Sequence, residues 1–343
     1  MPDSYPTSIA DKPWLHRSFD QLAALSARGN LAHSMLLAGA VGVGKLHLAQ
    51  ALAQMLLCVS PNTPKPCGKC SGCALVLSGN HPDLMFIQPA EGRQVTGVDA
   101  IREMGESLML KSHQGNYRVL IFPELADMTM AAANSLLKML EEPPPGTFFL
   151  CCSAKPGLLL PTIRSRLQLF RIKAPARSTT LNWLHQQHNI DKLDAENHLT
   201  LAQGAPLQIV AMLGQECSEQ RQQVFNLLMF CHQGISGSLH TVIRKLCTYA
   251  LRDNLKLIHA CMYDILQLHY NHDTDPALLN FRDKTEQMTQ WSRNIQPRHL
   301  FIVYDQLLAV QDACVKNIAV NQQLQLFNLA MLLHALLRKK PQS

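Results

Sequence analysis

Charged and aromatic residues are both scarce in this chain of 343 residues. Asp, Glu, Lys and Arg together make up 16% of it and Phe, Trp and Tyr 6%, whereas 47% of the residues are hydrophobic. A disordered chain shows the opposite balance, so the composition predicts folded domains with sizeable cores. The length suits about two or three domains. The formal net charge of +6 permits contact with nucleic acid without demanding it, because the basic residues do not form one long run.

Long apolar runs and familiar catalytic constellations are absent as well. No apolar run approaches the ~20 residues that span a bilayer, and residues 1–12 lack the apolar core of a signal peptide. No H-E-x-x-H motif, Ser-His-Asp set or pair of catalytic carboxylates can be argued from the sequence. These absences predict a soluble, cytoplasmic protein.

Cysteine is abundant by comparison, with eleven residues. Seven of them lie in apolar or helical stretches, where free thiols pack as small hydrophobic groups in a reducing compartment. These seven are Cys151, Cys152, Cys217, Cys231, Cys247, Cys261 and Cys314. The other four form a separate group with two consecutive C-x-x-C steps: Cys58, Cys67, Cys70 and Cys73.

The spacing of these four cysteines predicts a closed structural zinc site. Glycines between the thiols let the backbone fold around one ion, and four sulfurs suit tetrahedral Zn²⁺ with no open position for chemistry. Disulfides are disfavoured by the expected compartment. An iron–sulfur cluster also uses four cysteines, but its usual runs have different flanks and a trailing Cys-Pro. A zinc knuckle that reads nucleic acid is less favoured, since Lys65 and Lys69 are the only nearby basic residues.

One stretch follows the phosphate-loop pattern G-x-x-x-x-G-K-[ST] except at its last position, Leu46. The glycines of that pattern let backbone N–H groups surround nucleotide phosphates, the lysine reaches the outer phosphates, and the hydroxyl binds Mg²⁺. The candidate nucleotide-binding residues are Gly39, Gly42, Gly44 and Lys45. Apolar runs at 33–38 and 46–57 predict the flanking strand and helix. Leu46 has no oxygen to offer a metal ion.

A second part of an ATPase site is absent after the apolar strand that ends at Phe122. In phosphate-loop ATPases this strand ends in Asp-Glu, whose Asp helps to hold Mg²⁺ and whose Glu orients the attacking water. Pro123-Glu124 stands there instead, and proline cannot coordinate a metal ion. We interpret Glu124 as a solvated loop acid. The two losses predict a chain that does not hydrolyse ATP, and they leave open whether the loop still binds ATP weakly.

Two more stretches carry motifs. Residues 129–146 predict an Ala- and Leu-rich helix that contains Ala-Asn-Ser-Leu-Leu-Lys-Met-Leu-Glu-Glu-Pro-Pro and is stopped by three prolines. A buried strand is expected at 147–152, and the run Pro-Thr-Ile-Arg-Ser-Arg-Leu follows at 161–167. Together with the damaged phosphate loop and the cysteine insert, these motifs resemble the clamp-loader branch of the AAA+ ATPases. The resemblance covers about residues 14–215, and the remainder matches in length and helical character only.

The resemblance implies a role for Arg166 as an arginine finger. In that family a Ser-Arg-Cys motif projects its arginine into the ATP site of the neighbouring subunit, where such a residue raises the rate by ~10³–10⁵ in the best-studied cases. Here Leu167 replaces the cysteine, and Arg164 is the expected bystander. Without the resemblance, Arg166 is better interpreted as a surface arginine at a strand edge. The resemblance also implies a third loss, because Leu207 stands where active relatives carry a nucleotide-sensing arginine.

Alternating strands and helices predict a parallel α/β sheet in residues 1–174. Strands are expected near 34–38, 84–88, 117–122, 147–152 and 167–172. From about residue 218 the strands vanish and apolar residues recur at helical spacing. Combined with the resemblance, this predicts an AAA+ core with the zinc insert (1–174), a small helical lid (175–217) and an all-α collar domain (218–343).

The resemblance implies a non-hydrolysing subunit that completes an ATP-driven ring and helps to load a sliding clamp onto primed DNA. The expected partners are ATPase subunits of the gamma/tau type, a delta subunit, the sliding clamp and, through the complex, primer–template DNA, within a DNA polymerase holoenzyme. Two other functions stay open: an active ATPase of the same type, and a zinc-dependent DNA-binding module with a vestigial AAA+ fold.

Overall fold

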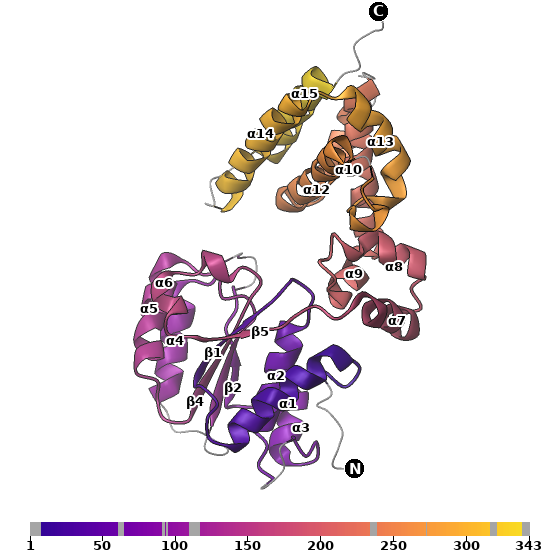
Figure 1. The fold of residues 1–343 in the computed structure, drawn as a ribbon. Coiled ribbons are helices and arrows are strands. Elements are labelled where there is room, and N and C mark those ends of the chain that lie inside the picture. The colour runs from indigo at the N-terminus through magenta and orange to yellow at the C-terminus, as the bar shows by residue number, and fades with distance from the viewer. Residues whose placement is uncertain are drawn as a thin grey trace, which may run out of the picture. The chain divides into compact units, whose positions relative to one another are not determined.

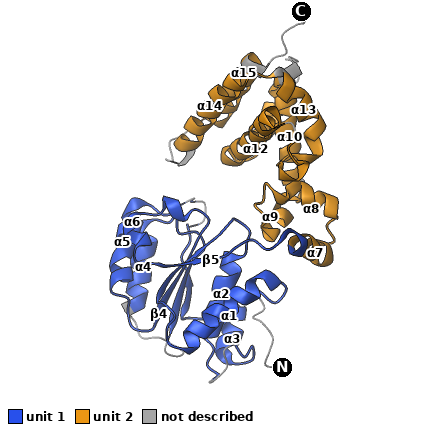
Figure 2. Ribbon diagram, in the orientation of Figure 1, with its two compact units in different colours: residues 1–179 blue, residues 180–343 orange. Residues whose placement is uncertain are grey.

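A computed structural model describes residues 8–60, 65–90, 93, 95–109, 117–233, 239–271, 273–315 and 321–337. The chain divides into two compact units, residues 1–179 and 180–343 (Figure 2). The further division of the second part into a lid and a collar at residue 217 stays a prediction. Across the described residues, no helix is both long enough and apolar enough to cross a membrane.

The first unit is built on a five-stranded parallel sheet with the order β2-β3-β4-β1-β5 (Figure 1). Its strands are β1 (Ser34–Ala38), β2 (Leu84–Phe86), β3 (Arg118–Phe122), β4 (Thr147–Ser153) and β5 (Gln168–Arg171). All five fall where the sequence predicts a strand, although β2 is shorter than expected. Every residue of β1 is buried, as a central strand covered on both faces requires. The predicted parallel α/β fold is confirmed.

Helices cover both faces of this sheet, with α1, α2 and α3 on one side and α4, α5 and α6 on the other (Figure 1). Their bounds are α1 (Pro13–Ala27), α2 (Lys45–Leu56), α3 (Ser71–Leu77), α4 (Val98–Met109), α5 (Met130–Glu141) and α6 (Pro161–Arg164), with a 3₁₀ turn at Pro156–Leu158. Alternate strand residues such as Leu120 and Phe122 point toward α4 and α5 and pack there with Ile101 and Leu136.

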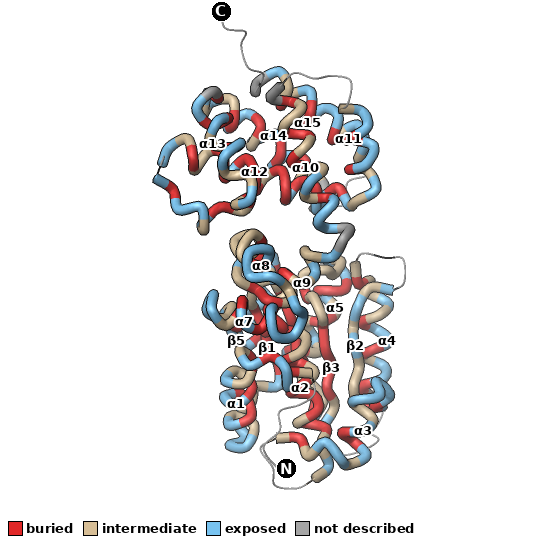
Figure 3. Tube along the Cα trace, turned by 90° about the vertical axis from the view of Figure 1, so that its right-hand side faces the viewer, coloured by how far each residue is buried: buried red, intermediate tan, exposed pale blue. Residues whose placement is uncertain are grey.

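The described residues of the second unit form helices and the connections between them. Its helices are α7 (Arg177–His188, which begins in the last residues of the first unit), α8 (Lys192–Leu199), α9 (Pro206–Met212), α10 (Gln215–Gln233), α11 (Leu239–Leu246), α12 (Leu251–Tyr270), α13 (Thr285–Asn294), α14 (Pro297–Val315) and α15 (Gln322–Leu337), with 3₁₀ turns at Pro276–Leu278 and Arg282–Lys284. One buried cluster joins α10 to α15, and the buried residues line the inner faces of these helices (Figure 3). An ion pair between Arg282 and Glu196, at 2.6 Å, ties α8 to the same bundle.

The cysteines outside the group of four divide into three kinds. Four are buried as the sequence predicts: Cys151, Cys152, Cys231 and Cys261. Cys247 is half-buried. Cys217 is exposed, so the expectation that it packs as a small hydrophobic group is wrong. The side chain of Cys314 lies outside those that the structure describes.

Candidate functional site

The phosphate loop connects β1 to α2 in the predicted way. Gly39 and Gly42 lie in the loop, Gly44 caps α2 and Lys45 is the first residue of the helix. Gly44 has φ +99°, which favours glycine, and a Cβ there would come within 2.8 Å of the Leu15 side chain. The shape of the loop is therefore supported by the conformation of Gly44 and its packing against Leu15.

Lys45 is turned back onto its own loop. Its Nζ donates hydrogen bonds to the carbonyl oxygens of Gly39 at 3.1 Å and Ala40 at 3.0 Å. The residue is only 8% exposed, and this burial lowers the pKa of its ammonium group. A further bond, from Trp14 Nε1 to the carbonyl oxygen of Val43 at 2.9 Å, fixes the loop against α1. The lysine that reaches phosphates in active loops here satisfies carbonyl groups of its own chain.

The Glu124 carboxylate accepts hydrogen bonds from the backbone, so Glu124 is not the solvated loop acid that we expected. Its Oε2 accepts a hydrogen bond from the backbone N–H of Ala154 at 2.9 Å, and its Oε1 accepts one from Ala126 at 3.3 Å. The residue is half-buried. It thereby joins the carboxyl ends of β3 and β4, a role that no local sequence signal indicates. Leu46 is half-buried in the first turn of α2, and its side chain has no oxygen atom.

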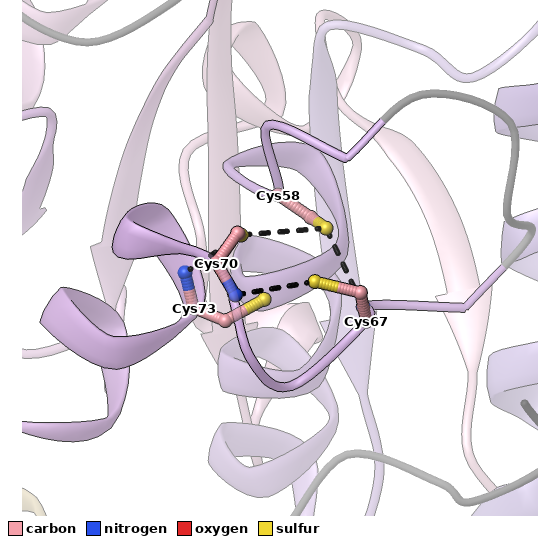
Figure 4. A group of neighbouring side chains, drawn as sticks. All are labelled: Cys58, Cys67, Cys70 and Cys73. Carbon is pink, nitrogen blue, oxygen red and sulfur yellow. Dashed lines mark hydrogen bonds between the residues drawn. The ribbon is translucent and has the colours of Figure 1, made fainter. Parts of the chain in front are cut away.

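The four cysteines of the predicted zinc site come together at the other end of α2. Their sulfurs all lie within 4.8 Å of one another, and Figure 4 shows them turned toward a common centre. Cys58 follows the end of α2, while Cys70 caps α3 and accepts the N–H of Cys73, a buried residue of that helix, at 3.4 Å. The close approach of α3 to α2 requires glycine at position 72, where a Cβ would lie 2.2 Å from the carbonyl oxygen of Leu57.

The donor set fits a zinc ion. Zn–S bonds of about 2.3 Å in a tetrahedron place neighbouring sulfurs about 3.8 Å apart, and Cys58 Sγ and Cys70 Sγ are 3.8 Å apart. Hydrogen bonds from the backbone N–H groups of Lys69 and Cys70 lower the pKa of Cys67 to about 6, which favours its thiolate. All four residues could bind one metal ion at once, with no protein carboxylate or histidine among them.

Arg166 lies between α6 and β5. Its Nη1 donates to the carbonyl oxygen of Thr162 at 2.8 Å, and its Nη2 forms an ion pair with Glu141, the last residue of α5. Its side chain is 35% exposed. Leu167, in place of the family's cysteine, is buried in the cluster beneath α5. Glu141 was missed by reasoning from the sequence, which gave it no partner.

Arg166 and the phosphate loop lie at opposite ends of the sheet. The loop follows the carboxyl end of β1, whereas Arg166 precedes the amino end of β5, which runs parallel to β1 beside it. Arg166 is thus separated from the chain's own loop by the length of the strands. Leu207 lies in the second unit, in the first turn of α9, and its predicted position at a nucleotide site stays a prediction.

Comparisons with known proteins agree with these features. A family model described as "DNA polymerase III, delta subunit" matches residues 15–176. The DNA polymerase III subunit delta' of Escherichia coli K12 is 28% identical over 319 residues, covering 93% of this chain and 94% of that protein. The delta' subunit of Yersinia pestis is 36% identical over 209 residues, covering 60% of this chain and 62% of that protein. A DNA polymerase III gamma subunit-related protein of Thermotoga maritima has the same fold, with a TM-score of 0.50 at 16% identity, covering 93% of this chain and all 100% of that one.

The parallel sheet, the phosphate loop and the helical second part define the AAA+ fold. Within that class, the chain is similar over most of its length to the delta' subunits of bacterial DNA polymerase III.

Proposed function

We propose that this chain is a non-hydrolysing, stator-like subunit of a DNA polymerase III clamp loader. It completes a ring with ATPase subunits of the gamma/tau type and a delta subunit, and the ring opens a sliding clamp and loads it onto primer–template DNA. The chain has no ATPase activity of its own. Its contribution to turnover is Arg166, which acts on ATP held by a neighbour.

The observation that carries this proposal is the state of the phosphate loop. Leu46 and Pro123 stand at the two positions where a hydrolysing site needs oxygen ligands for Mg²⁺. Lys45 bonds to two carbonyl oxygens of the loop, and Glu124, which would orient the water, is held by two backbone N–H groups. A loop with this arrangement has kept its structural contacts without the parts that perform chemistry.

The placement of Arg166 supports its action in trans. An arginine before the amino end of β5 lies at the opposite end of the sheet from the loop after β1, so it cannot reach a nucleotide in its own subunit. A guanidinium placed against a neighbour's γ-phosphate stabilises the charge that develops in the transition state.

The four-cysteine group supports a structural zinc ion as the only cofactor of the proposal. Cys58, Cys67, Cys70 and Cys73 would hold the ion, and its role would be to fix the segment between α2 and α3.

Arg166→Ala in the reconstituted ring tests the proposal. We expect the chain to fold and assemble, and the ATP turnover of the ring to fall only in part, because one ATP site faces this subunit. Clamp loading should fall further if it requires ATP hydrolysis at every site of the ring. Arg164→Ala is the matched control, with the same charge removed two residues away, and should be milder. Wild-type turnover and loading with Arg166→Ala, or a larger effect of Arg164→Ala, would contradict the role of Arg166.

A further inference from the structure

We infer that Glu141 is a positioning residue for Arg166, an inference that rests on the proposed function of that arginine. The Glu-Glu-Pro-Pro motif stands at the end of α5. Its first glutamate forms an ion pair with Arg166 Nη2, and the prolines end the helix directly after the motif.

The ion pair fixes the plane of the guanidinium. Nη1 donates to the carbonyl oxygen of Thr162 at 2.8 Å and contacts Ser165 Oγ at 3.4 Å, while Nη2 is held by Glu141. Contacts on both terminal nitrogens, from α6 and from α5, define the orientation of a planar group that carries five N–H donors. These contacts use at most three donors, so at least two N–H groups stay available for a phosphate.

The location of Glu141 supports a specific purpose. It is the last residue of α5. The carbonyl groups at this helix end carry a partial negative charge, which disfavours the carboxylate of Glu141. Arg166 offsets that charge, and it also bonds the carbonyl oxygen of Thr162 near the end of α6. The guanidinium therefore lies between the carboxylate at the end of α5 and a carbonyl oxygen of α6. Its long side chain loses its freedom within its own subunit, before a neighbour's phosphate has to order it.

The adjacent Glu142 offers a matched control. It is exposed, and in the described part of the chain its side chain has no ion-pair partner. Glu141→Gln and Glu142→Gln remove the same charge from neighbouring positions. They differ in the contact with Arg166, because a neutral amide makes a weaker bond to a guanidinium than a carboxylate does.

A double-mutant cycle in the reconstituted ring tests the inference. Steady-state ATP turnover is measured for rings that contain wild-type chain, Glu141→Gln, Glu142→Gln, Arg166→Ala, and the combination of Glu141→Gln with Arg166→Ala. We expect Glu141→Gln to lower kcat to a value between those of wild type and Arg166→Ala, with KM for ATP unchanged, since the arginine acts on the transition state. Glu142→Gln should match wild type. Adding Glu141→Gln to Arg166→Ala should cause no further loss, and Glu141→Asp should restore part of kcat.

Each outcome has a distinct meaning. If Arg166→Ala lowers kcat while Glu141→Gln equals Glu142→Gln, the arginine finger stands and the positioning role of Glu141 is refuted. If Glu141→Gln lowers kcat equally with and without Arg166, Glu141 acts by another route and the inference is wrong. If Arg166→Ala has no effect, the proposed function fails and the inference fails with it. The thermal unfolding of each isolated variant shows whether a loss of turnover reflects a loss of folded chain.

Discussion

Helix α2 connects two loops that differ in what holds them. At its amino end the phosphate loop is fixed by its own chain, through Lys45, the Trp14 indole and the packing of Leu15 against Gly44. At its carboxyl end the cysteine segment is held by weak N–H···S bonds around a group of four sulfurs. The first loop is held by contacts within the protein, whereas the second gathers four potential metal ligands. Contacts within the protein thus define the conformation of the first loop, whereas the second loop places four metal-binding side chains around one centre.

The largest expected effect is at the carboxyl end of α2. Freshly purified protein should contain about one zinc ion per chain, and Cys70→Ser should release it and lower the stability of the first unit. Metal binding at such sites contributes on the order of 10 kcal/mol and is coupled to local folding. Elemental analysis and thermal unfolding are the measurements, with Cys217→Ser, an exposed thiol elsewhere, as the control that keeps its zinc. Iron with a charge-transfer colour, or four free thiols without metal, would refute the assignment.

A smaller effect is expected at the amino end of the helix. Gly44→Ala places a methyl group 2.8 Å from Leu15 at φ +99°, and strain of this kind costs roughly 1–3 kcal/mol. The free energy of unfolding in urea, measured without nucleotide, should fall accordingly. Gly29→Ala is the control, because φ is +70° there but nothing lies within 4 Å. Equal losses in the two variants would mean that the packing against Leu15 contributes nothing to the loop.

Glu124→Gln should destabilise the first unit by about 1–2 kcal/mol, because an amide has one acceptor oxygen for the two N–H groups that the carboxylate satisfies. Glu142→Gln, at an exposed position, should change the free energy of unfolding by less than about 0.5 kcal/mol. If both variants behave alike in urea, Glu124 is a solvated acid after all.

The smallest effect concerns the buried ammonium group of Lys45. Burial lowers its pKa in the folded state below that in the unfolded chain, so the folded state binds its proton less readily. The cost of burying the charge is complete at neutral pH and is relieved as the pH rises through the lowered pKa toward the unfolded value. The free energy of unfolding of the wild type, relative to Lys45→Met, should therefore rise with pH over the alkaline range that ends at the ordinary lysine pKa of 10.5. If the difference in the free energy of unfolding between wild type and Lys45→Met stays constant or falls over that range, Lys45 is not a buried, charged group.

The sequence predicts those features of the fold and the site that depend on a fixed spacing of residues along the chain. The strands, the phosphate loop and the four-cysteine group each follow from short patterns whose chemistry is local, and the structure contains all three. The contacts of Glu124 and Glu141 do not follow from such patterns. Glu124 meets an N–H group 30 residues further along the chain, because β3 and β4 are neighbours in the sheet. Glu141 meets Arg166 because α5 lies against α6.

The ATP turnover of the isolated chain tests the central claim, that the phosphate loop is kept as structure without catalysis. We expect no magnesium-dependent hydrolysis from the wild type or from Leu46→Thr. In both proteins Pro123 still replaces the aspartate that helps to hold Mg²⁺, and Leu207 still replaces the expected nucleotide-sensing arginine. A turnover near ~1 s⁻¹, an ordinary enzymatic rate, that disappears in Lys45→Ala would contradict the account.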